Sequence, residues 1–259
     1  MRVAVITGAS SGMGRDFARQ IAMTGEVDVL WLIARREERL RELGEELSAE
    51  YGVSCMPLAL DLADKSSIQL YEEKLEAERP DIKYLVNAAG FGRFALSTEV
   101  PLDVSLEIAE VNDKALMAFC FLSIPLMGAG SHIINMGSLS SFQPVPYINV
   151  YGASKAFVLS FSRALNRELK PRGISVMCVC PGWVKTEFFD HAVSDNGAVT
   201  YYNKLWTPEE VVVKAMKDLR RGKDLSILGA GVRLQVLATK LLPHKLVMNV
   251  WLKQQKHKT

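Results

Sequence analysis

Short apolar runs rich in β-branched residues alternate along this chain with longer segments in which apolar residues recur at helical spacing. Such alternation is typical of a parallel sheet with helices on both faces. The apolar runs predict strands at residues 3–7, 27–34, 53–60, 84–87, 132–136, 175–180 and 225–228. The amphipathic segments predict helices at 15–24, 37–51, 65–79, 102–127, 150–170 and 208–221. No repeat, linker or low-complexity segment interrupts the pattern, which predicts a single α/β domain over residues 1–259 with a doubly wound, seven-stranded parallel sheet.

The composition is that of an ordinary soluble globular protein, with 49% hydrophobic and 23% charged residues among 259. The formal net charge of +2 lacks the strong basic excess of nucleic-acid-binding proteins, so we expect no nucleic-acid partner. The four cysteines form no Cys-x-x-Cys pair, which predicts a reduced, cytoplasmic location and no metal site. We expect no signal peptide, because residues 1–7 enter a buried strand, and no apolar run reaches the roughly 20 residues of a membrane span.

Three glycines, Gly8, Gly12 and Gly14, lie between the first predicted strand and the first predicted helix. Glycines at such a turn let the backbone approach a pyrophosphate, whose charge then meets the amide groups and the positive end of the helix. The same glycines would also suit an ordinary tight turn. Their place between the first strand and the first helix favours a dinucleotide site in a Rossmann-like domain.

The second predicted strand ends at Ala34 and is followed directly by Arg35 and Arg36. An acidic residue at this strand end would bind the ribose hydroxyl of NAD, whereas an arginine binds the 2′-phosphate of NADP. Two arginines therefore predict NADP(H) as the cofactor. The alternative is that both are surface charges of the next helix, paired with Glu38 or Glu42, and Arg36 fits this alternative better than Arg35.

Polar and small residues follow the third and fourth predicted strands. Asp61 would either accept a hydrogen bond from the adenine amino group or cap the next helix, although Asp64 is better placed as the cap. The small residues of Asn87-Ala-Ala-Gly90 permit a ligand to approach the backbone closely. Asn112 lies in an otherwise apolar helix, so its amide needs either a local helix partner or a polar relay.

Ser138, Tyr151 and Lys155 form the candidate catalytic set. Tyr151 and Lys155 are four residues apart at the start of a predicted helix, and Ser138 follows a predicted buried strand. A phenol titrates near 10, and an adjacent ammonium is expected to lower that pKa, so the set suits proton transfer to or from a carbonyl oxygen held by the serine. Taken alone, the short Tyr-x-x-x-Lys spacing would more often be a half-buried tyrosine and a solvated lysine.

Taken together, these motifs resemble the short-chain dehydrogenase/reductase superfamily over about residues 1–190. The shared elements, in order, are Thr7-Gly-x-x-x-Gly-x-Gly14, Asn87-Ala-Ala-Gly90, Asn112, Ser138, Tyr151-x-x-x-Lys155 and Pro181-Gly-Trp-Val-Lys-Thr186. The resemblance implies a catalytic tetrad of Asn112, Ser138, Tyr151 and Lys155. One departure is Gly137, where many members carry a second serine.

The resemblance also implies a set of cofactor-binding positions. Lys155 and Tyr151 would contact the nicotinamide ribose side, and the other positions are Gly8, Ser10, Ser11, Gly12, Met13, Gly14, Arg35, Arg36, Asp61, Leu62, Asn87, Ala88, Ala89, Gly90, Pro181, Gly182, Val184 and Thr186.

Two segments beyond these motifs concern the substrate. Residues 187–206 correspond to the family's substrate lid, and their aromatic residues suggest an apolar substrate, unless they only pack between lid and sheet. His191 in this segment is not expected to be catalytic. Residues 233–259 are basic, and beyond Pro243 the residues Leu246, Val247, Val250 and Trp251 share one helical face. This face would either pack on the protein itself or make a weak contact with an anionic membrane or an acyl carrier.

The sequence therefore predicts an NADPH-dependent oxidoreductase that interconverts a ketone and a secondary alcohol. The resemblance is to the NADP-preferring branch containing 3-oxoacyl and hydroxysteroid reductases, which implies an apolar small-molecule substrate and a homodimer or homotetramer. Two other functions are considered: a dinucleotide-sensing regulator, which would commonly lack the tyrosine, and a nucleotide-sugar epimerase or dehydratase, which would carry a longer carboxyl-terminal domain.

Overall fold

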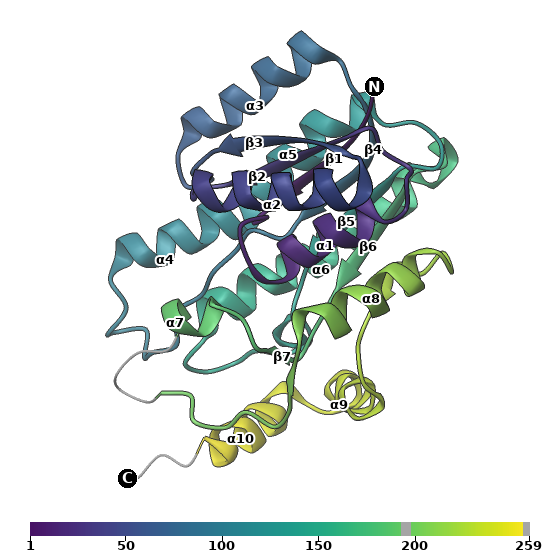
Figure 1. Ribbon diagram of the computed structural model, residues 1–259. Helices are drawn as coiled ribbons and strands as arrows, with labels where there is room; N and C mark the ends of the chain where they lie inside the picture. The colour runs from purple at the N-terminus through teal and green to yellow at the C-terminus, as the bar shows by residue number, and fades with distance from the viewer. Residues whose placement is uncertain (193–197, 256–259) are drawn as a thin grey trace.

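The computed structural model describes residues 1–192 and 198–255, and its centre is a seven-stranded parallel sheet (Figure 1). The strands are β1 (Arg2–Thr7), β2 (Val29–Ala34), β3 (Ser54–Ala59), β4 (Asp81–Asn87), β5 (His132–Met136), β6 (Ser175–Val179) and β9 (Leu225–Ser226). Their order across the sheet is β3-β2-β1-β4-β5-β6-β9, and every neighbouring pair is parallel. The predicted doubly wound, seven-stranded parallel sheet is confirmed.

Successive residues of each central strand point to opposite faces of the sheet. In β1, Ala4 and Ile6 belong to one buried cluster, whereas Val3 and Val5 belong to the other. Both faces are covered, so Val3 to Ile6 are apolar without a break instead of alternating with polar residues.

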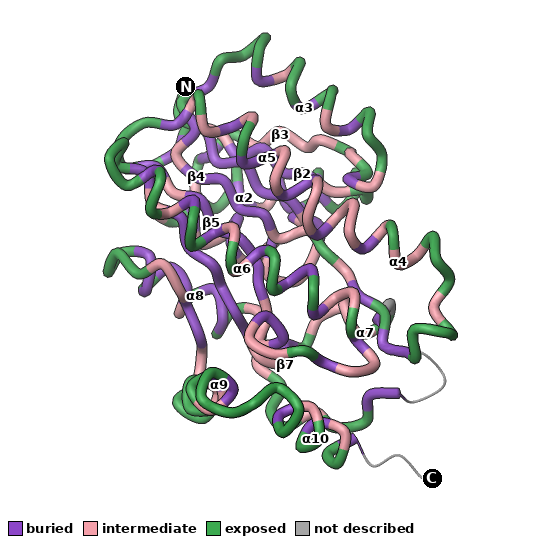
Figure 2. The backbone as a smooth tube through the Cα atoms, turned by 180° about the vertical axis from the view of Figure 1, so that it is seen from behind, coloured by how far each residue is buried: buried purple, intermediate pink, exposed green. Residues whose placement is uncertain are grey.

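Helices from different parts of the chain cover the two faces (Figures 1 and 2). One face packs against α1 (Gly12–Ala22), α2 (Glu37–Tyr51) and α8 (Pro208–Leu219). The other packs against α3 (Lys65–Glu78), α5 (Leu116–Ser123) and α6 (Asn149–Leu169). In α1 the buried stripe includes Phe17, Ala18 and Ile21, whereas α5 is apolar on all sides and leaves Phe121 exposed.

The segment predicted as one helix over residues 102–127 is not a continuous α-helix. It consists of α4 (Leu102–Ala109), a π-helical turn η1 (Glu110–Ala115), α5 and a 3₁₀ turn η2 (Ile124–Leu126). The wide turn falls where the Asn112 side chain bonds the backbone of Phe91, a contact between segments that helical periodicity does not report. Two further 3₁₀ turns are η3 (Leu139–Phe142) and η4 (Lys170–Arg172).

The segments after β6 form a smaller layer below the carboxyl ends of the strands (Figure 1). It contains the paired strands β7 (Trp183–Val184) and β8 (Leu205–Trp206), with α7 (Phe188–Ala192), α9 (Ala230–Leu241) and α10 (His244–Gln254). Its core joins α10 to the loop before α6, since Trp251 packs with Val145 and Ile148 and donates a 3.0 Å hydrogen bond from Nε1 to the Pro146 oxygen.

The apolar face expected in the carboxyl-terminal segment is divided. Val247 and Trp251 are buried, at 8% and 9% exposure, whereas Leu246 and Val250 are 47% and 48% exposed. The packing alternative is therefore correct for Val247 and Trp251. Within residues 1–192 and 198–255, no helix is both long enough and apolar enough to cross a membrane. Lys256 and Lys258, and residues 193–197 of the expected lid, lie outside the described residues.

Candidate active site

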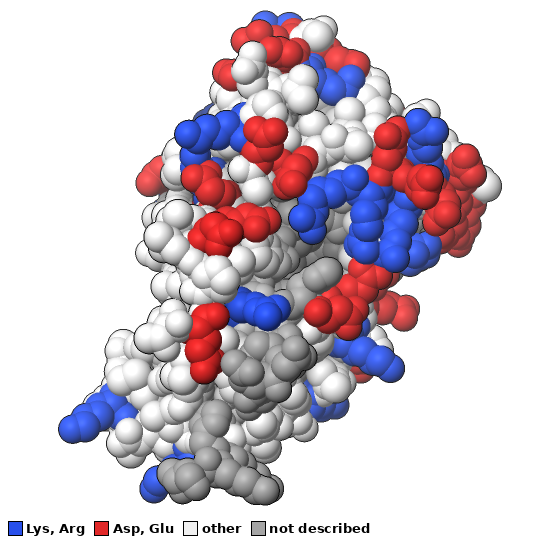
Figure 3. All heavy atoms as spheres, turned by 90° about the vertical axis from the view of Figure 1, so that its left-hand side faces the viewer, with Lys and Arg blue, Asp and Glu red and all other residues white. Residues whose placement is uncertain are grey.

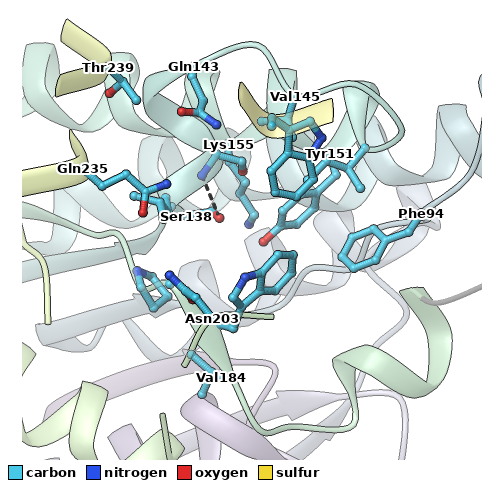
Figure 4. A pocket seen from close by; sticks show the side chains of 18 of the residues that line it. Phe94, Ser138, Gln143, Val145, Tyr151, Lys155, Val184, Asn203, Gln235 and Thr239 are labelled. Atoms are coloured by element: carbon cyan, nitrogen blue, oxygen red, sulfur yellow. Dashed lines mark hydrogen bonds between the residues drawn. The ribbon is translucent and has the colours of Figure 1, made fainter. Parts of the chain in front are cut away.

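A cavity of about 300 Å³ lies where the chain leaves β4, β5 and β6, and residues of α7, α9 and α10 complete its walls (Figure 4). Predicted catalytic and predicted cofactor residues line it together, namely Met13, Ala88, Gly90, Ser138, Tyr151, Lys155, Pro181, Gly182, Val184 and Thr186. The carboxyl ends of parallel strands are where open α/β sheets bind ligands. The structure thus brings these positions from five separate stretches of sequence to one place.

Ser138 is the second residue after β5 and caps η3, and hydrogen bonds fix its loop to α6. Its Oγ accepts from the Ser140 amide at 3.2 Å, and its own amide donates to Ser141 Oγ at 3.1 Å. Ser141 Oγ in turn donates to the Lys155 carbonyl oxygen at 2.7 Å. The serine loop and the helix that carries Tyr151 therefore hold a fixed relative position.

Tyr151 and Lys155 point into the cavity from adjacent turns of α6. Lys155 is buried, and its Nζ donates a 2.9 Å hydrogen bond to the Met136 carbonyl oxygen and lies 5.6 Å from the centre of the Tyr151 ring. Figure 4 shows Ser138, Tyr151 and Lys155 around the same space. This is the neighbourhood that the four-residue spacing predicts.

Burial dominates the titration of this pair. It raises the pKa of the Tyr151 phenol to about 12, although the Ser138 hydroxyl opposes the shift. It also lowers the pKa of Lys155 to about 8, against the opposing field of Asp113. The expectation of a lowered pKa for Tyr151 is therefore wrong for this structure, because burial disfavours the phenolate more than the hydrogen bond of Ser138 favours it.

Asp113, next to Asn112, is a charged neighbour that the sequence did not single out. Burial raises the pKa of its carboxyl to about 6, and the positive charge of Lys155 acts in the opposite direction. Among the described residues, its buried Oδ1 has no hydrogen-bond partner. The electrostatic interaction with Lys155 is thus its main link to the cavity.

Asn112 occupies the π-helical turn and bonds the loop after β4. Its Oδ1 accepts from the Phe91 amide at 3.0 Å, and its Nδ2 donates to the Phe91 carbonyl at 2.9 Å and to Ser154 Oγ at 3.0 Å. A Cβ at Gly90 would lie 2.9 Å from Asn112 Oδ1 and 3.2 Å from Lys155 Nζ. Asn112 and Lys155 therefore flank one point, and only a glycine leaves room between them.

The glycine turn after β1 is packed tightly against its own surroundings. Gly8 has a φ of +69°, and a Cβ there would lie 2.7 Å from the Ala89 amide nitrogen. A Cβ at Gly14 would lie 2.6 Å from the Gly8 carbonyl carbon. These two glycines are thus required by close backbone contacts, and they allow α1 to begin at the end of β1 with its amide groups directed to the same edge of the sheet.

Arg36 points back to the glycine turn, whereas the expected alternative paired it with Glu38 or Glu42. Its guanidinium donates to Ser10 Oγ and Ser11 Oγ, both at 3.0 Å, and forms a 2.7 Å ion pair with Glu187. Arg39 forms a second ion pair with Glu187 at 2.6 Å, and the two arginines lower the pKa of that carboxyl to about 2. Arg35 is exposed.

The remaining predicted cofactor positions differ in how their side chains are bonded or buried. Asp64 caps α3 by accepting from the Ser66 amide at 2.9 Å, while Asp61 accepts from the Ala63 amide at 3.1 Å. Leu62 is buried in the core, so its backbone alone is available to a ligand. The Asn87 amide is also buried and donates to Asn135 Oδ1 at 2.9 Å, which fixes the ends of β4 and β5.

Several residues of the site were not predicted from the sequence. A Cβ at Gly92 would lie 2.8 Å from the Tyr151 ring, so this glycine makes room for the phenol. The only signal for it is its position two residues after Gly90. Gln143 and Gln235 also line the cavity, and no local pattern marks them because they come from different elements.

Comparisons with known proteins agree with this geometry. A family model described as short chain dehydrogenase matches residues 2–197. Sulfoacetaldehyde reductase 2 of Chromohalobacter salexigens is 39% identical over 206 residues, which are 74% of this chain and 79% of that protein. The NADP-dependent 3-hydroxy acid dehydrogenase of Schizosaccharomyces pombe is 33% identical over 235 residues, 86% of this chain and 88% of the relative.

Two solved structures resemble the whole fold. A short-chain dehydrogenase from Sphingobium yanoikuyae in complex with NADPH superposes with a TM-score of 0.80 at 28% identity, covering 96% of both chains. The bulky-bulky ketone specific alcohol dehydrogenase from Comamonas testosteroni superposes with a TM-score of 0.74 at 26% identity, covering 100% of this chain and 97% of the other.

Fold and site together define an oxidoreductase that acts on CH–OH and C=O groups. The chain belongs to the short-chain dehydrogenase family.

Proposed function

We propose that the protein reduces a neutral, apolar ketone to a secondary alcohol with NADPH, and catalyses the reverse oxidation. The observation that carries the proposal is the convergence of Ser138, Tyr151 and Lys155 on one cavity that the expected cofactor positions also line. A dinucleotide sensor does not need a proton donor at this position, so the convergence favours an enzyme over a sensor.

The side chains divide the proton chemistry among them. Ser138 would hold the carbonyl oxygen, and Tyr151 would donate the proton to it. A pKa of about 12 keeps the phenol protonated at neutral pH, the form that reduction requires. Lys155, bonded to the Met136 oxygen, would hold a positive charge behind the phenol. Asn112 would connect Lys155 to solvent through a water, as the tetrad resemblance implies.

The cofactor positions fit a dinucleotide. The turn from Gly8 to Gly14 holds the start of α1 at the sheet edge, and Ala88 and Gly90 leave an open wall beside Met13 and Thr186. Arg35 and Arg36 would bind the 2′-phosphate, and the NADPH complex and NADP-dependent relative described above support this choice. When bound, the nicotinamide supplies or accepts the hydride.

The walls of the cavity support an apolar substrate such as a 3-oxoacyl or steroid-like compound. Lys155 is the single Lys, Arg, Asp, Glu or His among the described residues that line it. A sulfonate or carboxylate buried there would lack a cationic partner beyond Lys155, which the chemistry occupies. The sulfoacetaldehyde and 3-hydroxy acid relatives are named for anions, whereas the ketone-specific alcohol dehydrogenase is named for bulky ketones.

Residues 187–206 would act as the lid of this cavity. Phe188 lies 5.3 Å from the Tyr151 ring and 5.9 Å from Phe94, measured between ring centres. Trp183 contacts Tyr202 at 4.8 Å and Phe189 at 5.9 Å. Within the segment, Phe188 and Phe189 both pack with other aromatic residues and line the cavity, which supports both explanations of the segment. The side chain of His191 lies outside the described residues.

We also propose self-association through α5 and α6. Phe121 is 54% and Phe157 is 38% exposed; Phe157 stacks on Phe161, and Phe121 meets the same ring edge to face. An apolar aromatic surface of this kind, formed by two neighbouring helices, suits a symmetric contact with a second copy of the chain, as in a homodimer or homotetramer.

A weak contact with an anionic membrane is proposed for the exposed part of α9 and α10. Leu234, Leu237 and Leu241 share one exposed face of α9 and are at least 53% exposed. No acidic residue follows Asp224, and Lys and Arg are the charged residues visible at the lower end of the face in Figure 3. Co-sedimentation with phosphatidylserine vesicles at low salt tests it. We expect binding that salt and Leu237→Ser/Leu241→Ser both weaken, and absence of binding would refute the contact.

The proposed reaction is tested by the loss of NADPH absorbance with a panel of aryl and cyclic ketones at neutral pH. Turnover of apolar ketones, with little or none of sulfoacetaldehyde or 3-oxo acids, is expected. A protein that binds NADPH but reduces no ketone would favour the sensor function instead.

A further inference from the structure

The cavity has two chemically different regions on either side of Ser138 and Tyr151. Near the Tyr151 ring the cavity is aromatic. The ring centre of Phe94 lies 5.9 Å from that of Phe188 and 6.0 Å from that of Trp183. Near Ser138 it contains the amides of Gln143 and Gln235. Figure 4 shows both glutamines on the Ser138 side and Phe94 across Tyr151 from them.

The two glutamines come from elements that pack together. Gln143 is the carboxyl-terminal cap of η3, and Gln235 lies in the middle of α9, which contacts η3. Both line the cavity and both are partly buried. Their shared position is thus set by the contact between η3 and α9.

Neither glutamine amide is already used in a hydrogen bond within the described part of the protein. Within the described part of the chain, no side-chain hydrogen bond joins Gln143 or Gln235 to another residue, whereas the neighbouring Thr239 hydroxyl donates to the Val236 oxygen at 2.8 Å. The buried Gln255 shows the contrast, since its Oε1 accepts from the Thr200 and Tyr201 amides. Polar groups facing an apolar cavity need partners once a substrate displaces water.

We propose, on the basis of the ketone reduction proposed above, that the substrate carries two unlike arms. One arm is bulky and apolar and lies among Phe94, Trp183 and Phe188. The other bears a neutral hydrogen-bonding group, such as a hydroxyl, amide, ester or second carbonyl, that Gln143 and Gln235 bind. The group is neutral because no charged side chain other than Lys155 lines the described cavity.

Three phenyl ketones of matched length test this assignment. Their second arms end in a primary amide, in an isopropyl group of similar shape, and in a carboxylate. For the wild type we expect kcat/KM to be at least about tenfold higher for the amide than for the isopropyl compound, because a site built for hydrogen bonds rejects an analogue without them. The carboxylate should be the poorest of the three.

Substitutions of the two glutamines test whether they cause the preference for the amide ketone. Gln235→Leu and Gln143→Leu should each lower kcat/KM for the amide ketone and leave that for the isopropyl ketone equal or higher. The control is Thr239→Val, which lines the same region but whose hydroxyl is already bonded, and it should change both substrates by one factor.

Equal losses for both substrates in the glutamine variants would overturn the assignment, as would a wild type that prefers the isopropyl or the carboxylate ketone. In those cases ketone reduction itself would stand. Failure to turn over any of the three ketones with NADPH bound would instead contradict the proposed reaction, and this assignment with it.

Discussion

At the scale of single residues, the site depends on how burial sets the charge of Tyr151 and Lys155. The phenol, with a pKa of about 12, stays protonated across the neutral range. Lys155, with a pKa of about 8, is charged below that pH and neutral above it. The titration of the lysine, not that of the tyrosine, therefore falls near the working pH.

This order of pKa values predicts the pH dependence of ketone reduction. The profile of kcat/KM for the ketone, which at saturating NADPH reports groups of the enzyme–coenzyme complex, should be level near neutral pH and fall above about 8 as Lys155 loses its proton. Initial rates at saturating NADPH between pH 6 and 10 provide the measurement. A profile that stays level to pH 10 would contradict this role of Lys155.

Asp113 provides the control for that profile. Its carboxylate favours the charged form of Lys155, so Asp113→Asn should lower the pKa of the lysine further and move the falling limb to lower pH. A merely structural role for Asp113 would change the rate without moving the limb.

At the scale of elements, the site residues are held by contacts between segments far apart in the chain. Gly137 at the end of β5 faces Cys178 of β6 and Cys180 just beyond it, and a Cβ there would lie 2.7 and 2.8 Å from their sulfur atoms. The two cysteines thus fill the space that a side chain at position 137 would need. This explains why glycine replaces the serine common in the family.

Gly137→Ser should accordingly lower the free energy of unfolding by about 1–3 kcal/mol, the usual cost of overpacking a core. Thermal unfolding of Gly137→Ser is compared with that of Gly137→Ser/Cys178→Ala/Cys180→Ala, which should recover most of the loss. The second control is Gly128→Ser, at a position where an added Cβ would have no atom within 4 Å. If the triple variant were no more stable than Gly137→Ser, the steric explanation would be wrong.

We expect the junction of β2 and α2 to control the choice of coenzyme. A charged hydrogen bond to the 2′-phosphate contributes about 1.5–3 kcal/mol, so Arg35→Ala should weaken NADPH binding roughly tenfold to a hundredfold and leave NADH nearly unchanged. Dissociation constants for both coenzymes can be measured by fluorescence titration. Arg41→Ala is the matched control, since Arg41 pairs with Glu37 on the same helix. Equal losses for the two coenzymes would refute the assignment.

Features that depend on residues close together in the sequence could be predicted, whereas features that depend on distant contacts could not. The seven strands of the main sheet, most of the helices and the pair Tyr151 and Lys155 follow from local sequence patterns, and they were predicted, whereas α7 and α9 were not. The π-helical turn at Asn112 and the ion pair of Arg36 with Glu187 depend on contacts 21 and 151 residues apart. The pKa of Tyr151 was predicted in the wrong direction because burial in the folded site cannot be read from the adjacent lysine.

At the scale of the whole molecule, the aromatic surface on α5 and α6 predicts self-association. Sedimentation velocity at micromolar concentration should show a dimer or tetramer, and Phe157→Glu should shift it towards monomer because a charge would be buried at the contact. Leu70→Glu, at an exposed apolar position on α3, is the control and should leave the assembly unchanged. A wild-type monomer would contradict the proposed surface.

The central claim is that Tyr151 delivers the proton in an NADPH-dependent reduction. Tyr151→Phe keeps the ring and its contact with Phe188, so NADPH binding should be retained while turnover falls by roughly two to four orders of magnitude. Tyr201→Phe, at a second tyrosine that lines the cavity, should keep its activity. The decisive measurement is the turnover number of Tyr151→Phe with NADPH shown to be bound: a value below about a hundredth of wild type is predicted, and one above about a tenth would contradict the account.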